Sequence, residues 1–133
     1  MSIIQWAMFC NDFELDEHRR PNLLGLLNEI QAKRFPCSHP RLFIAAHFLG
    51  TPNEIVAVEV AGYRPDGAQM GKTVCPQLPL SDVGSAYFVH GLKSLTLPFP
   101  GMYRFEVTTP NNPPYRLDLH VLQAIFDASG ATR

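Results

Sequence analysis

An acidic cluster near the N-terminus has the residue types that bind calcium. Four carboxylates fall between residues 12 and 17, and Ca²⁺ takes six to eight oxygen ligands. Two apolar residues interrupt the cluster, however, and the glycine that lets an EF-hand loop turn sharply is missing. We therefore interpret the cluster as a solvated loop with Arg19 and Arg20 as counter-charges. Its members are Asp12, Glu14, Asp16 and Glu17.

A second group of residues includes soft and borderline metal ligands. Cys37 and His39 form a Cys-x-His pair, and His47 follows eight residues later. Structural zinc commonly uses two closely spaced pairs, and no second pair is present. His47 is expected on an outer face, because its neighbours are expected to point inward. Folding could still assemble a metal or catalytic site from distant histidines, and the sequence leaves this open for His39, His47, His90 and His120.

No motif of nucleophilic, phosphate-binding or metalloprotease chemistry survives inspection. The sequence has no Gly-x-Ser-x-Gly elbow and no His-Glu-x-x-His pair. Met70-Gly71-Lys72-Thr73 is similar to the end of a P-loop, but Gly67 lies four positions before Gly71 rather than five, and its flanks have strand patterns. We interpret it as a β-turn or an edge feature. We accordingly predict no enzyme, no cofactor, and no catalytic, cofactor-binding or metal-binding residue.

Length and composition predict one domain. The 133 residues match the common domain size of about 100–150, with the domain expected at residues 1–126 and a flexible tail at 127–133. Eleven basic residues are scattered among twelve acidic ones, which is not the clustered charge that binds nucleic acid. No apolar run approaches the roughly 20 residues that span a bilayer, and no secretory signal is recognisable. With three cysteines, an odd number, we predict reduced thiols and a cytoplasmic protein without membrane contact.

Proline and alternating apolar residues predict an all-β fold. Twelve prolines divide the chain into segments too short for ordinary helices. Apolar side chains alternate in 42–48, 56–60, 88–92, 103–107 and 117–121, as in half-buried strands. Arg64-Pro65-Asp66-Gly67 has the composition of a tight turn. We predict a two-sheet antiparallel sandwich, immunoglobulin-like or jelly-roll-like, of about seven to eight strands.

The last two alternating runs predict a hairpin with a defined register. A Pro- and Asn-rich linker joins them, and opposite charges stabilise a strand pair when they face each other. We predict Arg104 opposite Asp118 and Glu106 opposite Arg116, with the apolar residues of the two runs facing each other.

The segment Leu23–Ile30 resists this pattern. Leu23, Leu26, Leu27 and Ile30 have helical spacing and Asn22 is a possible N-cap, although Gly25 weakens a helix by about 1 kcal/mol. Periodicity alone therefore slightly favours a helix over a strand.

The chain also resembles a group of small bacterial β-sandwich proteins catalogued only as a domain of unknown function. The resemblance rests on the order of several segments from about Ile4 to Val121, and it implies a strand at Leu23–Ile30 but no activity. The segments are Ala7-Met8-Phe9-Cys10-Asn11-Asp12, Asn22-Leu23-Leu24-Gly25-Leu26-Leu27-Asn28-Glu29-Ile30, Phe35-Pro36, Arg64-Pro65-Asp66-Gly67, Leu97-Pro98 and Pro100-Gly101-Met102-Tyr103-Arg104-Phe105-Glu106-Val107.

The functional hypothesis is a non-enzymatic interaction or assembly module. Charged residues make up 17% of the chain, against about 25% in ordinary domains, and sandwich edges can pair with another chain. A protein partner or a homo-oligomer is therefore expected. The alternative is a small-ligand or carbohydrate-binding sandwich with an exposed aromatic face. The aromatic residues expected to be exposed are Trp6, Tyr63, Tyr87 and Tyr115.

Overall fold

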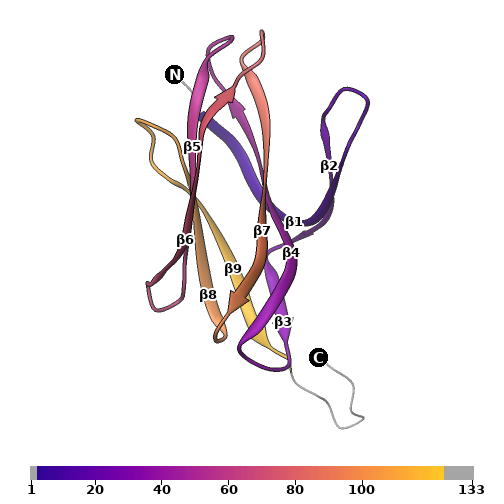
Figure 1. The fold of residues 1–133 in the computed structure, drawn as a ribbon, viewed down its shortest axis with the longest axis vertical. Coiled ribbons are helices and arrows are strands. Elements are labelled where there is room, and N and C mark those ends of the chain that lie inside the picture. Colours follow the sequence, from indigo (N-terminus) through magenta and orange to yellow (C-terminus); the bar gives the residue numbers. More distant parts are fainter. Residues whose placement is uncertain (1–2, 125–133) are drawn as a thin grey trace.

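The computed structural model describes residues 3–124, and nine β-strands occur in this range (Figure 1). They are β1 (Ile3–Leu15), β2 (Pro21–Leu27), β3 (Glu29–Ala32), β4 (Cys37–Leu49), β5 (Ile55–Tyr63), β6 (Gln69–Pro79), β7 (Ser85–Leu97), β8 (Gly101–Thr108) and β9 (Tyr115–Gln123). No helix in the described range has the length and apolar character needed to cross a membrane. The domain boundary at residue 126 stays a prediction, and the tail predicted at 127–133 lies outside the described residues.

The nine strands form two sheets that share one core. The order is β2-β1-β4-β7 in the four-stranded sheet and β3-β9-β8-β5-β6 in the five-stranded sheet. The predicted all-β sandwich is therefore confirmed. The predicted count of seven to eight strands is wrong, and the sandwich is not antiparallel throughout, because β3 pairs with β9 in parallel.

The short strands β2 and β3 raise the number of strands above the predicted seven to eight. They also explain the apolar pattern of the segment Leu23–Ile30. Leu23 and Leu27 are half-buried in β2 of the four-stranded sheet, whereas Ile30 is buried in β3 of the five-stranded sheet. The helical spacing therefore arises because the chain changes sheets at Asn28. The helix favoured by periodicity is wrong, and the strand implied by the resemblance is present.

The hairpin of β8 and β9 has the predicted register. Arg104 lies opposite Asp118, and Glu106 lies opposite Arg116. The ion pairs nevertheless form along each strand, with Arg116 Nε 2.9 Å from Asp118 Oδ1 and Arg104 Nε 3.5 Å from Glu106 Oε2. Residues two apart in a strand lie on the same face, so each carboxylate has a cation on its own strand as well as across the hairpin.

Alternating apolar side chains of both sheets fill the core. The predicted inward residues Leu42, Ile44, Ala46 and Phe48 of β4 are all buried. Across the core, the rings of Phe9 and Phe105 meet edge to face at 5.4 Å. The Tyr103 ring is fully buried, and its hydroxyl donates a 2.6 Å hydrogen bond to the Phe99 carbonyl. Full burial of a large apolar side chain is worth about 1.5–3 kcal/mol.

One end of the sandwich is held together by two loops that cross between the sheets (top of Figure 1). Residues 50–54 join β4 to β5, and residues 80–84 join β6 to β7. The Gly50 N–H donates to the Gly84 carbonyl at 2.8 Å, and the Leu80 N–H donates to the Glu54 carbonyl at 2.8 Å. Gly84 has a φ of 76°, and a Cβ there would lie 2.2 Å from the Gly50 oxygen. Only glycine permits this approach of the two loops.

The predicted turn at 64–67 joins β5 to β6. The Gly67 N–H donates to the Arg64 carbonyl at 2.9 Å. β6 is the outermost strand of its sheet in the described range. This position explains why the strand tolerates Pro76 and Pro79, since a proline has no N–H to donate to a neighbouring strand.

Candidate functional site

Two of the acidic residues considered as calcium ligands have cationic partners within the chain. Asp12 forms an ion pair with Arg41 at 2.9 Å, and Asp16 forms one with Arg20 at 2.8 Å. The backbone N–H of Arg20 donates to the Asp16 carboxylate, and this bond is the main reason that the pKa of Asp16 lies below its ordinary value. In residues 3–124, no three His, Cys, Asp or Glu side chains gather in an arrangement that could hold a metal.

The four histidines considered above as possible site residues lie in different surroundings. His39 Nε2 is 3.3 Å from the side-chain oxygen of Asn11, and His47 Nδ1 bonds the side-chain oxygen of Gln5. His90 lines a cleft between the sheets, and His120 is exposed on β9. The three cysteines are free thiols: Cys10 is buried, and Cys37 and Cys75 are half-buried.

The outer face of the four-stranded sheet is lined by apolar and aromatic side chains, and we call it the apolar face. Cys10 and Ala45 are buried here, although none of the described strands forms a further layer over them, because larger neighbours shield them. Leu26 is 61% exposed and Tyr87 42% exposed. From the strand pairing, the apolar face comprises Trp6, Met8 and Cys10 of β1, Leu24 and Leu26 of β2, Phe43, Ala45 and His47 of β4, and Tyr87 and Val89 of β7.

A row of three rings crosses the apolar face from β1 to β7. Trp6 lies opposite His47, and His47 lies opposite Tyr87. The ring centroids of Trp6 and His47 are 6.0 Å apart with an interplanar angle of 22°, and those of His47 and Tyr87 are 4.6 Å apart. As predicted, His47 points away from the core. Trp6 and Tyr87 were expected to be exposed; Tyr87 is, and Trp6 is half-buried.

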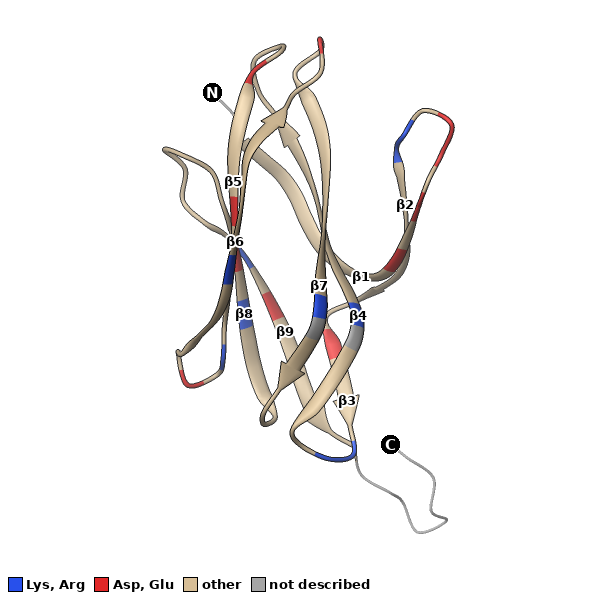
Figure 2. Cartoon of the chain, in the orientation of Figure 1, with Lys and Arg blue, Asp and Glu red and all other residues tan. Residues whose placement is uncertain are grey.

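The outer face of the five-stranded sheet, which we call the charged face, has the opposite character. Lys72 lies 3.0 Å from Glu59, and the Arg104 guanidinium lies 4.8 Å from the centroid of the Tyr63 ring. Figure 2 shows acidic and basic positions along β5, β6, β8 and β9, whereas long stretches of β1, β4 and β7 carry neither. The charged face comprises Glu59, Ala61, Tyr63, Lys72, Val74, Arg104, Glu106, Arg116 and Asp118.

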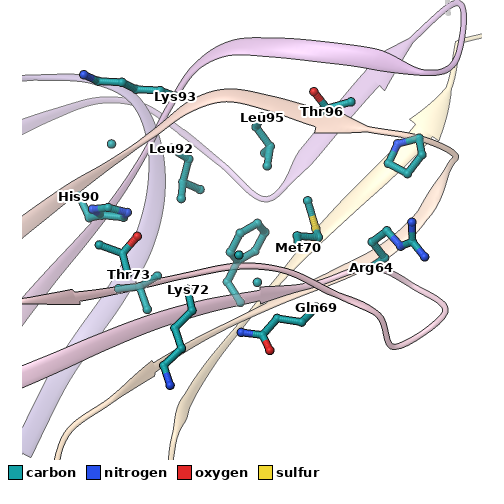
Figure 3. Close-up of a pocket in the computed structure, with 16 residues that line it drawn as sticks. Arg64, Gln69, Met70, Lys72, Thr73, His90, Leu92, Lys93, Leu95 and Thr96 are labelled. Atoms are coloured by element: carbon teal, nitrogen blue, oxygen red, sulfur yellow. The ribbon is translucent and has the colours of Figure 1, made fainter.

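A cleft of about 920 Å³ opens between the two sheets, where β6 and β7 diverge (Figure 3). Leu92 and Leu95 of β7 point into it from one side and Met70 of β6 from the other. Phe105 forms part of its floor, and its ring lies over Gly62, where a Cβ would meet it at 2.8 Å. The lining includes Arg64, Lys72 and Lys93 but no Asp or Glu. This cleft can accept an apolar group with uncharged or acidic ends.

Burial shifts the titration of two histidines. It lowers the pKa of His47 on the apolar face and that of His90 in the cleft, because partial desolvation disfavours the imidazolium. Burial also raises the pKa of the Cys10 thiol. All three groups are therefore biased towards their neutral forms, which suits apolar contact rather than charge-driven chemistry.

Sequence reasoning missed the cleft and most of the apolar face. Alternation did indicate that Phe88, His90 and Leu92 share a face. It could not show that β6 and β7 are outermost strands, which is what leaves their inner side chains partly uncovered. The sequence did contain one signal for the cleft. Gly71, at an inward position of β6, lies opposite Gly62, so two facing positions there lack side chains.

Comparisons with known proteins identify a family without an assigned activity. No curated protein matches the chain. Among solved structures, similarity is found to a β-glucosidase from Listeria innocua in complex with isofagomine, with a TM-score of 0.49, 12% identity, and coverage of 88% of this chain and 16% of that one. The same enzyme in complex with glucose gives a TM-score of 0.49, 11% identity, and coverage of 90% and 16%. This chain thus spans about one-sixth of that enzyme. The sequence matches a family of unknown function, DUF6941, over residues 5–122, and the chain belongs to that family.

Proposed function

We propose that this domain is a non-enzymatic, cytoplasmic interaction module that contacts another protein, or a second copy of itself, through the apolar face. The contrast between the two outer faces carries the proposal. The face of a sheet that is exposed to water ordinarily carries polar side chains, as the charged face does. Contiguous exposed apolar patches of more than a few hundred Å² mark interaction surfaces.

The composition of the apolar face supports a protein partner. The cores of protein interfaces are depleted in charged residues and enriched in aromatic residues and Met. Trp6, Tyr87, Met8 and Phe43 have these types, and the charged side chains Asp12 and Arg41 stand at one end, paired with each other. Removal of such a surface from water provides the non-directional driving force of association.

Trp6 offers a direct test, because it is the single tryptophan of the chain and lies on the apolar face. We expect concentration-dependent association in light scattering, or a stoichiometric partner in a pull-down from the native host, accompanied by a change in Trp6 emission. The double variant Leu26→Ser/Tyr87→Ser should abolish the association and the accompanying change in Trp6 emission. The matched control is Val74→Ser, which replaces a 54% exposed apolar residue on the charged face. A monomer at all concentrations with no stoichiometric partner contradicts the proposal.

A second candidate function, carbohydrate binding, is favoured by the row of Trp6, His47 and Tyr87. Aromatic faces stack on the apolar faces of sugar rings, and a Tyr or Trp also has a polar group for hydrogen bonding. Titration with a panel of oligosaccharides should then change Trp6 emission saturably. The Tyr87→Ala variant should weaken the response. Leu26→Ser should leave it unchanged, because Leu26 lies on β2 opposite Cys10 and not beside a member of the row.

A further inference from the structure

The cleft between β6 and β7 lies on the inner side of the sheets and is separate from the apolar face. β6 has β5 as its single neighbour, and β7 has β4 as its single neighbour among the described strands. Each strand therefore presents an unpaired backbone edge of N–H and C=O groups. The two edges border the same opening, so the cleft is a gap in the sandwich at which both sheets end.

We propose that this cleft accepts an extended polypeptide segment of a partner protein, which pairs with the free edge of β7 and inserts alternate apolar side chains between the sheets. Addition of a strand to an exposed sheet edge is an established mode of peptide recognition, in which backbone bonds give affinity and pockets for alternate side chains give specificity. This site goes beyond the proposed contact through the apolar face.

The dimensions of the cleft fit a strand. The part of β7 that borders it runs from His90 to Thr96. At about 3.3 Å per residue this stretch is roughly 20 Å long, the length of an ordinary strand of five or six residues. A volume of about 920 Å³ lies at the upper end of the range of small-molecule sites, about 300–1,000 Å³.

The walls are suited to side chains that alternate. Inward residues of an added strand would contact Leu92, Met70 and Phe105, which are already partly or fully buried against the core. Gly71 faces the same space, and a Cβ there would meet nothing within 4 Å. β6 thus has room for a side chain of the occupant at Gly71, which lines the same cleft as Leu92 and Leu95 of β7.

Charge complementarity specifies the outward residues of the added strand. Lys93 is exposed on β7 and lies opposite Arg41 of β4, a like charge. Arg41 is compensated by Asp12, whereas no ion pair of the described residues involves Lys93. Opposite charges across strands stabilise their pairing and like charges oppose it. The occupant therefore has an Asp or Glu beside Lys93.

The test is selection of peptides from a random dodecapeptide mRNA-display library on the full chain, followed by affinity measurement by fluorescence anisotropy. Enriched peptides should alternate apolar and polar residues over five or six positions and carry an acidic residue at a polar position. Amide hydrogen exchange should slow in residues 90–95 when they bind. Enrichment of no peptide, or of peptides without alternation, overturns the proposal.

Two variants of β6 localise the binding. Gly71→Phe should fill the cleft and weaken the selected peptides by at least about tenfold, equivalent to about 1.4 kcal/mol. Its matched control, Val74→Phe, adds an aromatic ring to the opposite face of the same strand and should bind as the original chain does. Equal binding to all three chains overturns the proposal, as does saturable binding of dodecanoate, a small apolar anion, in the absence of any peptide binding.

A third variant keeps the test decisive if Gly71→Phe does not fold. Lys93→Glu changes an exposed position and should weaken acidic peptides by about tenfold, while a peptide with Lys in place of its acidic residue should bind this variant better than the original chain. If Lys93→Glu has the same charge preference as the original chain, the proposal that the peptide lies beside β7 is overturned. The Leu26→Ser/Tyr87→Ser variant should bind the peptides normally, so failure at the apolar face and failure at the cleft are distinguishable.

Discussion

The two outer faces of this sandwich are built from the same strand geometry and have opposite chemistry. On the charged face, Ala61 lies between Lys72 and Glu106. At the corresponding place on the apolar face, Ala45 lies between Met8 and Val89. Both alanines are buried, at 6% and 1% exposure. One face is shielded by ion pairs and the other by apolar side chains, so only the apolar face gains from contact with a further apolar surface.

The largest expected effect comes from placing a carboxylate at these two alanines. Ala45→Asp puts a short charged side chain among apolar neighbours, with no cation at the facing positions Met8 and Val89, and should lower the free energy of unfolding by about 2–4 kcal/mol. Ala61→Asp lies next to Lys72 and should cost about 1 kcal/mol. Urea denaturation measures the loss of stability in each variant, provided that its m-value equals that of the original chain. Equal losses would show that the two faces do not differ as described.

A smaller effect is expected within the row of rings on the apolar face. A double-mutant cycle of Trp6→Ala and His47→Ala should give a coupling energy of about 0.5–1 kcal/mol, because cross-strand aromatic pairs are stabilised beyond their buried area. The coupling should be the same in about 0.05 M and about 1 M salt, where the Debye length falls to roughly 3 Å. A coupling that disappears in high salt would contradict an apolar origin.

The equivalent cycle on the charged face should give a smaller and salt-sensitive value. Glu59 and Lys72 are partly exposed, at 39% and 51% of their side chains, and such pairs contribute about 0.2–1 kcal/mol. The cycle of Glu59→Gln and Lys72→Met, measured by urea denaturation in the same two salt concentrations, should show the coupling decrease in high salt. A salt-independent coupling on the apolar face and a salt-sensitive coupling on the charged face would distinguish the two faces most clearly.

The smallest expected effect is a pH dependence that belongs to the apolar face. Because the pKa of His47 is lowered in the folded protein, the unfolded chain takes up the proton at higher pH. The corresponding stability is present above the unfolded pKa, about 6.5, and is lost as the pH falls through the folded pKa. The decrease in free energy of unfolding from about pH 7.5 to about pH 5 should be smaller in His47→Gln than in the original chain. Equal decreases in the two chains would contradict this contribution of His47.

The sequence predicted the strands better than the surfaces. Alternation placed Leu42, Ile44, Ala46 and Phe48 in the core, and facing charges gave the register of β8 with β9, because both are determined by neighbours that pair locally. The segment Leu23–Ile30 misled periodicity because its apolar residues belong to two different sheets, and no local pattern reports a change of sheet.

The candidate sites were less accessible to sequence reasoning for the same reason. Trp6, His47 and Tyr87 come from three strands that are distant in the chain, and their row exists only once β4 lies between β1 and β7. The cleft depends on β6 and β7 being outermost, and several sandwich topologies fit the same succession of strands. Residue types were therefore visible in the sequence, whereas strand order, which brings them together, was not.

We expect the close approach of Gly84 to Gly50 to act as a hinge of the sandwich. Hydrogen bonds between the two crossing loops fix β6 and β7 at one end, and the strands separate towards the other end, where the cleft opens. Displacement about a fixed end increases with distance from it, so the gap between the sheets can widen there while the fixed end stays intact. We expect amide exchange to be slowest beside residues 50–54 and 80–84 and faster towards the turn at 64–67, so that the domain can open without unfolding.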